Sequence, residues 1–117
     1  MTDGNDQDYK DVALAFATAV ATRDYTGAHA MTSRQYQAAN TPEALKAAFE
    51  AVVPLDWGPI DPIAMGLTMD SWPGQESDDV GWAYVGLGGD VYSEAVTVVV
   101  TLEGDELKIR TVEFGRP

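Results

Sequence analysis

Two titratable side chains, His29 and Glu94, are the candidates for acid–base chemistry in this sequence. The chain contains one histidine, and imidazole is the side chain that ordinarily changes charge near neutral pH. To act as a general base, His29 needs a substrate and an orienting carboxylate within hydrogen-bond distance. The alternative is a histidine on a helix surface or at a helix cap, with no chemical role.

Glu94 falls within the longest alternating apolar run, residues 91–102. Side chains of a strand alternate between two faces, so Glu94 shares a face with the apolar residues at even positions. Burial disfavours the charged form of a carboxyl group, which is how a general base is tuned. Two structural alternatives stay open: the strand end is exposed, or Glu94 pairs across strands with Arg110 or Lys108.

Aromatic and methionine side chains are concentrated in the second half of the chain. At strand spacing such residues usually form core, and next to a curved sheet they also line apolar cavities. We therefore expect any small-ligand site between the apolar face of the sheet and the first two helices. Its predicted wall consists of Phe16, Tyr25, Met65, Trp82, Tyr84 and Tyr92.

The elements that must position these residues begin with helices. Residues 1–7 are polar and expected to fray, and apolar residues then recur at helical spacing over 8–22. A short second helix is expected over 24–33. Thr41, followed by proline and glutamate, is a start signal for a third helix over 42–53.

After the proline-rich segment 54–62 the apolar period changes to two. This alternation predicts strands over residues 63–69, 80–85, 91–102 and 107–114. Helices first and antiparallel strands afterwards indicate an α+β fold. We expect three N-terminal helices packed on a curved antiparallel sheet of about four strands.

The last predicted strand changes its apolar face near Arg110 and Thr111. Such a switch predicts a β-bulge or burial on both faces. A bulge would turn Arg110 or Glu113 toward a site; a structural ion pair is the alternative.

Composition narrows the class of protein. With 117 residues and 45% hydrophobic residues, the chain forms one domain spanning 1–117. Its 19 acidic and 7 basic residues give a net charge of −12, which disfavours binding to nucleic acids and anionic membranes. The absence of cysteine excludes thiolate metal sites, and a single histidine excludes a multi-histidine site. We expect no metal and no cofactor.

Localisation is also predicted from the pattern of apolar residues. No stretch approaches the roughly 18 apolar residues of a membrane span, and the first residues lack the basic and apolar segments of a secretory signal. We therefore expect a cytoplasmic protein.

Helical residues 8–22, the segment RDYTGAHAM (23–31), a capped third helix and a strand-rich end closing with EFGRP (113–117) resemble the nuclear transport factor 2-like, or SnoaL-like, superfamily. The closest likeness is to small bacterial domains of that superfamily. The resemblance implies a cystatin-like roll, in which a curved sheet wraps around a long helix and leaves a conical pocket. Members include isomerases, dehydratases, hydrolases, transport factors and immunity proteins, so the fold alone does not determine function.

Three functions remain open. The first is a non-enzymatic module that binds a ligand or another protein. The second is an isomerase or hydrolase with a carboxylate base in the pocket. The third is an acidic, immunity-type protein that blocks a basic toxin. Whether the chain is an enzyme is left undecided.

A homodimer is expected through the sheet, because the second face of strand 91–102 is flat and mildly apolar. That face consists of Ala95, Thr97, Val99 and Thr101. A small apolar ligand and a basic protein are the other partners considered.

Overall fold

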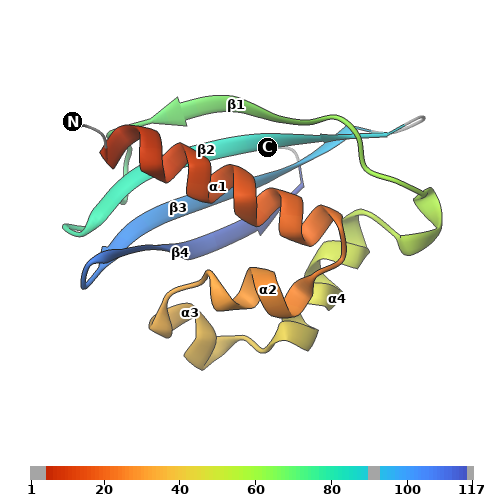
Figure 1. Ribbon diagram of the computed structural model, residues 1–117, viewed down its shortest axis with the longest axis horizontal. Coiled ribbons are helices and arrows are strands. Elements are labelled where there is room, and N and C mark those ends of the chain that lie inside the picture. The colour runs from red at the N-terminus through yellow and green to blue at the C-terminus, as the bar shows by residue number, and fades with distance from the viewer. Residues whose placement is uncertain (1–4, 90–92, 116–117) are drawn as a thin grey trace.

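The structure is a computed structural model that describes residues 5–89 and 93–115. Within these ranges the fold is α+β, with the helices preceding an antiparallel sheet as predicted. The elements are α1 (Asn5–Ala21), α2 (Tyr25–Ala30), α3 (Arg34–Ala39), α4 (Pro42–Val52), the 3-10 turn η1 (Leu55–Trp57), β1 (Ile63–Met69), β2 (Asp79–Gly88), β3 (Ser93–Glu103) and β4 (Glu106–Phe114). Helix α1 crosses one face of the sheet, and α2, α3 and α4 gather on the β4 side (Figure 1).

The described residues contain four α-helices, so the prediction of three is wrong. The expected second helix over 24–33 is divided, because Ser33 accepts a hydrogen bond from the N–H of Tyr36 and starts α3. Helix α1 begins at Asn5, earlier than predicted, so residues 5–7 are helical rather than frayed. None of the described helices is long and apolar enough to cross a membrane.

Side-chain caps start two of the helices, and one of them is the start predicted at Thr41. Asp24 caps α2 by accepting a hydrogen bond from the N–H of Gly27 at 3.0 Å. Thr41 caps α4 by accepting one from the N–H of Ala44 at 3.0 Å. These side chains satisfy N–H groups that the helix itself leaves unpaired.

The strands pair in the order β1-β2-β3-β4, and each neighbouring pair is antiparallel. The core lies between this sheet and α1. Phe16 of α1 is fully buried there, together with Val85 of β2 and Val98 of β3. At one end the ring of Tyr9 packs so closely on Gly81 that a Cβ at position 81 would overlap it.

The bulge predicted in the last strand is confirmed. Val99 pairs with Thr111 while Val100 pairs with Ile109, which leaves Arg110 as the extra residue of β4. Because of this extra residue, positions 110 and 111 lie on the same face of the sheet, and Val112 and Phe114 face the helices as Ile109 does.

The two edges of the sheet differ. Thr32, between α2 and α3, forms a parallel bridge with Ile109 of β4. The N–H of Ser33 donates to the carbonyl of Ile109 at 2.8 Å, and the N–H of Ile109 donates to the carbonyl of Met31 at 2.9 Å. The edge of β4 is therefore covered at Ile109 by this segment, whereas β1 forms the other edge.

Candidate functional site

Glu94 lies near the start of β3, on the side of the sheet that faces the helices. Its Cα pairs with that of the buried core residue Leu87, and its own side chain is half-buried. This position confirms the prediction that Glu94 lies on the apolar face of its strand. Neither proposed cross-strand partner reaches it, because Arg110 and Lys108 form ion pairs with other carboxylates. A catalytic role for Glu94 stays a prediction.

The imidazole of His29 contacts two nearby residues, Asn40 and Tyr36. Its Nε2 lies 2.7 Å from the carbonyl oxygen of Asn40, so that nitrogen carries a hydrogen and donates it. The imidazole packs edge-on against the ring of Tyr36, with ring centroids 6.4 Å apart. Within residues 5–89 and 93–115, no carboxylate hydrogen-bonds to this ring. This geometry agrees with the alternative of a histidine that has no chemical role, since His29 links α2 to the segment before α4.

The predicted wall of six aromatic and apolar residues is not brought together. Phe16 is fully buried, so its ring fills the space between α1 and the sheet instead of lining an opening. Met65 of β1 packs half-buried against the same core. Trp82 and Tyr84 alternate with buried residues of β2 and lie on the opposite face. The expectation that they face the helices is wrong, and Tyr92 lies outside the described residues.

Tyr25 occupies a corner between α2 and α4. Its hydroxyl donates a hydrogen bond to Glu50 at 2.8 Å and accepts one from Arg23 at 3.3 Å. Burial raises the pKa of Tyr25 above its ordinary value, and the Arg23 bond opposes that effect only in part. Arg23 adopts a left-handed φ of 67° and also donates to the carbonyl of Val53. The cluster ties the start of α2 to the end of α4.

Arg110 forms an ion pair whose partner, Asp79, the sequence analysis did not identify. The Nε and Nη2 atoms of Arg110 donate to the two carboxylate oxygens of Asp79 at 2.7 and 2.6 Å. Its Nη1 donates to Glu76 at 3.2 Å. The Asp79 side chain is 0% exposed, and that of Arg110 is 15% exposed. The bulge aims Arg110 at this carboxylate, so of the two outcomes considered for the bulge, the structural ion pair is the one found.

The electrostatics of the pair oppose a role in acid–base catalysis. Burial raises the pKa of Asp79, but hydrogen bonds from Arg110, from the backbone of Glu76 and from Thr101 outweigh it, so the pKa lies below the ordinary value. The Asp79 carboxylate raises the pKa of Arg110. Both groups stay charged at neutral pH, and a carboxylate with a lowered pKa is a weak base.

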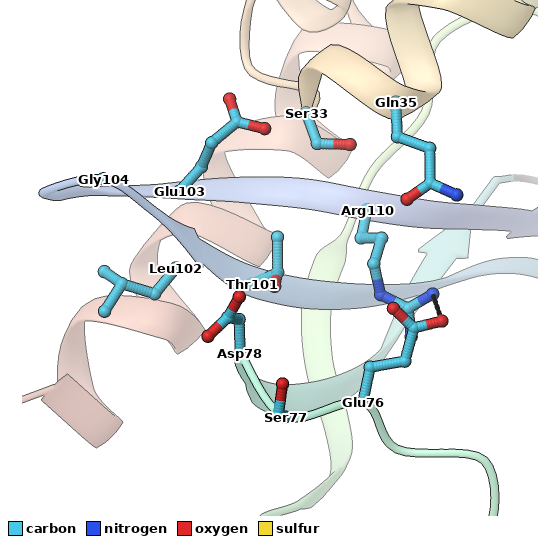
Figure 2. A pocket seen from close by; sticks show the side chains of 10 residues that line it. All are labelled: Ser33, Gln35, Glu76, Ser77, Asp78, Thr101, Leu102, Glu103, Gly104 and Arg110. Atoms are coloured by element: carbon cyan, nitrogen blue, oxygen red, sulfur yellow. Dashed lines mark hydrogen bonds and ion pairs between the residues drawn. The ribbon is translucent and has the colours of Figure 1, made fainter.

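A polar pocket of about 300 Å³ lies beside this pair. It is formed where the β3–β4 hairpin, the loop before β2 and the start of α3 meet, and Figure 2 shows Arg110 and Glu76 bonded within it. Its lining residues are Ser33, Gln35, Glu76, Ser77, Asp78, Thr101, Leu102, Glu103, Gly104 and Arg110. Arg110 and Glu76 pair with each other and Ser33 caps α3, so these groups are already engaged in holding the fold together.

The face of the sheet opposite α1 carries large apolar side chains. Trp82 and Tyr84 are half-buried there, and Leu67 of β1 is 62% exposed. No described helix packs across this face (Figure 1). We call this surface the outer sheet face; strand register and alternation place on it Leu67, Met69, Trp82, Tyr84, Thr97, Val99 and Thr111, of which Val99 is buried.

The second face predicted for strand 91–102 belongs to this surface. The valines at 96, 98 and 100 are buried in the core beneath the helices. The alternating residues Ala95, Thr97, Val99 and Thr101 therefore lie on the outer sheet face, as expected.

Among the described residues, no group of three or more His, Cys, Asp and Glu side chains is placed to hold a metal ion. Comparisons with protein-family models, with curated proteins and with solved structures find no match for this chain. The outer sheet face is thus the candidate functional site on its geometry alone.

Proposed function

We propose that this protein is a non-enzymatic interaction module that binds another protein through the outer sheet face. One observation carries the proposal: Trp82, Tyr84 and Leu67 stand on a sheet face that no described helix covers. Exposed contiguous apolar surface on a folded domain is typical of interaction sites, and aromatic residues are enriched in protein interfaces.

We also propose that the fold is a roll of the nuclear transport factor 2-like kind. The support is the order of elements, with helices first, a β1–β4 meander afterwards and α1 lying across one sheet face (Figure 1). In this proposal the helix layer supplies the core, and the opposite sheet face supplies the contact surface.

Site-specific photocrosslinking in living cells tests the proposed surface. A benzophenone amino acid replaces Leu67 on the outer sheet face, and in a matched control it replaces Leu14, which is 36% exposed on α1. We expect a crosslinked product of higher mass from position 67 and none from position 14. Absence of a product at 67, or products at both positions, would contradict the proposal. The mass of the product also identifies the partner, including a basic protein of the kind considered for an immunity function.

A further inference from the structure

The cations on the outer sheet face are already paired. Among the described residues, strand register and the bulge of β4 place Arg110 and Lys108 on this face. Arg110 binds Asp79 and Glu76, and Lys108 binds Glu106. A partner that approaches the face therefore finds its positive charges neutralised by carboxylates of the same chain.

The carboxylate of Glu113 is different. Glu113 is exposed on β4, and its pairing with Thr97 puts it on the outer sheet face. Within residues 5–89 and 93–115, no cation forms an ion pair with it. The charge that this face offers to a partner is thus negative, in a chain whose net charge is −12.

An aromatic ring lies two strands away from this carboxylate in the same row. Tyr84 pairs with Thr97, and Thr97 pairs with Glu113, so the three side chains are neighbours across β2, β3 and β4. Directly opposed residues have Cβ atoms about 5 Å apart. Thr97 is smaller than either neighbour. A group placed above it therefore lies on the order of 5 Å from both the ring and the carboxylate.

A guanidinium group fits between these two neighbours. It is planar and always charged, it stacks on aromatic rings, and it donates two parallel hydrogen bonds to a carboxylate. Resting on the proposed function, we propose that the partner of the outer sheet face is a basic protein that places an arginine side chain over Thr97, between the ring of Tyr84 and the carboxylate of Glu113.

The next row strengthens this contact. Met69 pairs with Trp82, and Trp82 pairs with Val99, so an apolar row lies directly beside Tyr84 and Thr97. A partner that covers the apolar row excludes water from the neighbouring charge contact. Partly buried charges are screened by salt much less than exposed ones, so the arginine contact should persist at physiological ionic strength.

Other partners fit the charge of the face less well. An acidic protein or a nucleic acid would bring like charge to the free carboxylate of Glu113. A second copy of this chain carries the same net charge of −12 and the same free carboxylate. A basic protein instead gains from the overall charge as it approaches, because opposite net charges accelerate association.

Fluorescence anisotropy of labelled hexa-arginine and hexalysine peptides, titrated with the full chain at about 150 mM salt, tests the arginine contact. We expect hexa-arginine to bind at least about threefold more tightly than hexalysine, because the ring of Tyr84 favours guanidinium. Tyr84→Leu should abolish this preference and leave hexalysine binding within about twofold, whereas Tyr84→Phe, which keeps the ring, should retain it.

Glu113→Gln tests the charge contact. It should weaken hexa-arginine binding at least about threefold. Because Glu113 is exposed, this variant keeps the fold and the test holds even if Tyr84→Leu unfolds. Glu43→Gln, which removes an equal charge from an exposed position on α4, is the matched control and should change binding by less than about 1.5-fold.

Equal binding of the two peptides, or equal losses in Glu113→Gln and Glu43→Gln, overturns the inference. If position 67 then still crosslinks to another protein, the proposed interaction function stands and only the arginine contact is wrong. A crosslinked product with the mass of two copies of this chain would also overturn the basic partner. Arginine binding as expected without any crosslink from position 67 would contradict the proposed function and leave the arginine contact standing.

Discussion

The two faces of β2 place residues of one strand in contrasting surroundings. On the helix side lie Gly81, Ala83 and Val85, which are all buried. On the outer sheet face lie Trp82 and Tyr84, which are larger and half-buried. Close packing of α1 selects small residues on the first face, because Tyr9 occupies the space that a side chain at 81 would need. The large apolar side chains of β2 therefore lie on the outer sheet face, which no described helix covers.

The largest expected effect on stability is the difference between removing an aromatic ring from the helix side of the sheet and removing one from the outer sheet face. Phe16→Ala should lower the free energy of unfolding by about 3–5 kcal/mol, because it empties a fully buried site. Tyr84→Ala should lower it by about 1 kcal/mol at most, through lost cross-strand contact with Thr97. Urea unfolding at low protein concentration measures both. Equal losses would show that the outer ring belongs to the core and would remove the contrast between the faces.

A smaller loss of stability is expected when the ion pair between Arg110 and Asp79 on the outer sheet face is broken. Arg110→Met should lower the free energy of unfolding at pH 7 by about 3 kcal/mol, since it leaves the buried Asp79 carboxylate without its cation. Arg34→Met, which removes an exposed cation on α3, is the control and should change it by less than about 0.5 kcal/mol.

The pH dependence of that loss has a definite sign. In the unaltered protein the folded-state pKa of Asp79 is lowered, so its stabilisation is complete above the ordinary value of about 3.9 and is lost as the pH falls through the lowered pKa. In Arg110→Met burial still raises the pKa of Asp79, but the guanidinium that lowered this pKa is gone. The deficit relative to the unaltered protein should therefore be largest at pH 7 and smaller near pH 3. Urea midpoints across this range measure it, and a deficit that grows toward acid pH would contradict the assignment.

The smallest expected effect on stability is the difference between alanine substitutions at two glycines of β2. Gly81→Ala should lower the free energy of unfolding by about 2 kcal/mol, because its Cβ meets the buried ring of Tyr9. Gly86→Ala, on the outer sheet face, would bring its Cβ 3.6 Å from the carbonyl oxygen of Ala64, an ordinary contact. That variant should be unchanged or up to about 0.5 kcal/mol more stable. Thermal unfolding followed by circular dichroism separates them, and a larger loss at 86 than at 81 would reverse the assignment of the faces.

Local patterns predicted most of the sheet. Alternation predicted β1 at the observed residues 63–69, and of the two explanations offered for the switch of apolar parity near Arg110, the bulge is the one found. The helix count was missed because a serine cap at Ser33 interrupts a stretch whose composition favours one continuous helix. Short caps of this kind compete closely with helix continuation, so composition alone does not decide between them.

The candidate site was harder to predict, since it depends on which of two apolar faces the helices cover. Residues 80–85 carry apolar side chains on both faces, and the alternating pattern alone does not show which face the helices cover. Here the choice follows from the fit of Tyr9 over Gly81, a contact between distant parts of the chain. The partner of Arg110 was missed for a similar reason, because the register of three strands brings Asp79 to it.

The bridge between Thr32 and Ile109 joins the helical part of the chain to β4. During synthesis the segment around Thr32 therefore leaves the ribosome long before its backbone partners exist. Until β4 forms, the edge of β3 stays open and the α2–α3 connection has no strand to bond. The fold is thus completed only after β4 has been synthesised, and chains that stop after β3 would expose an unpaired strand to one another.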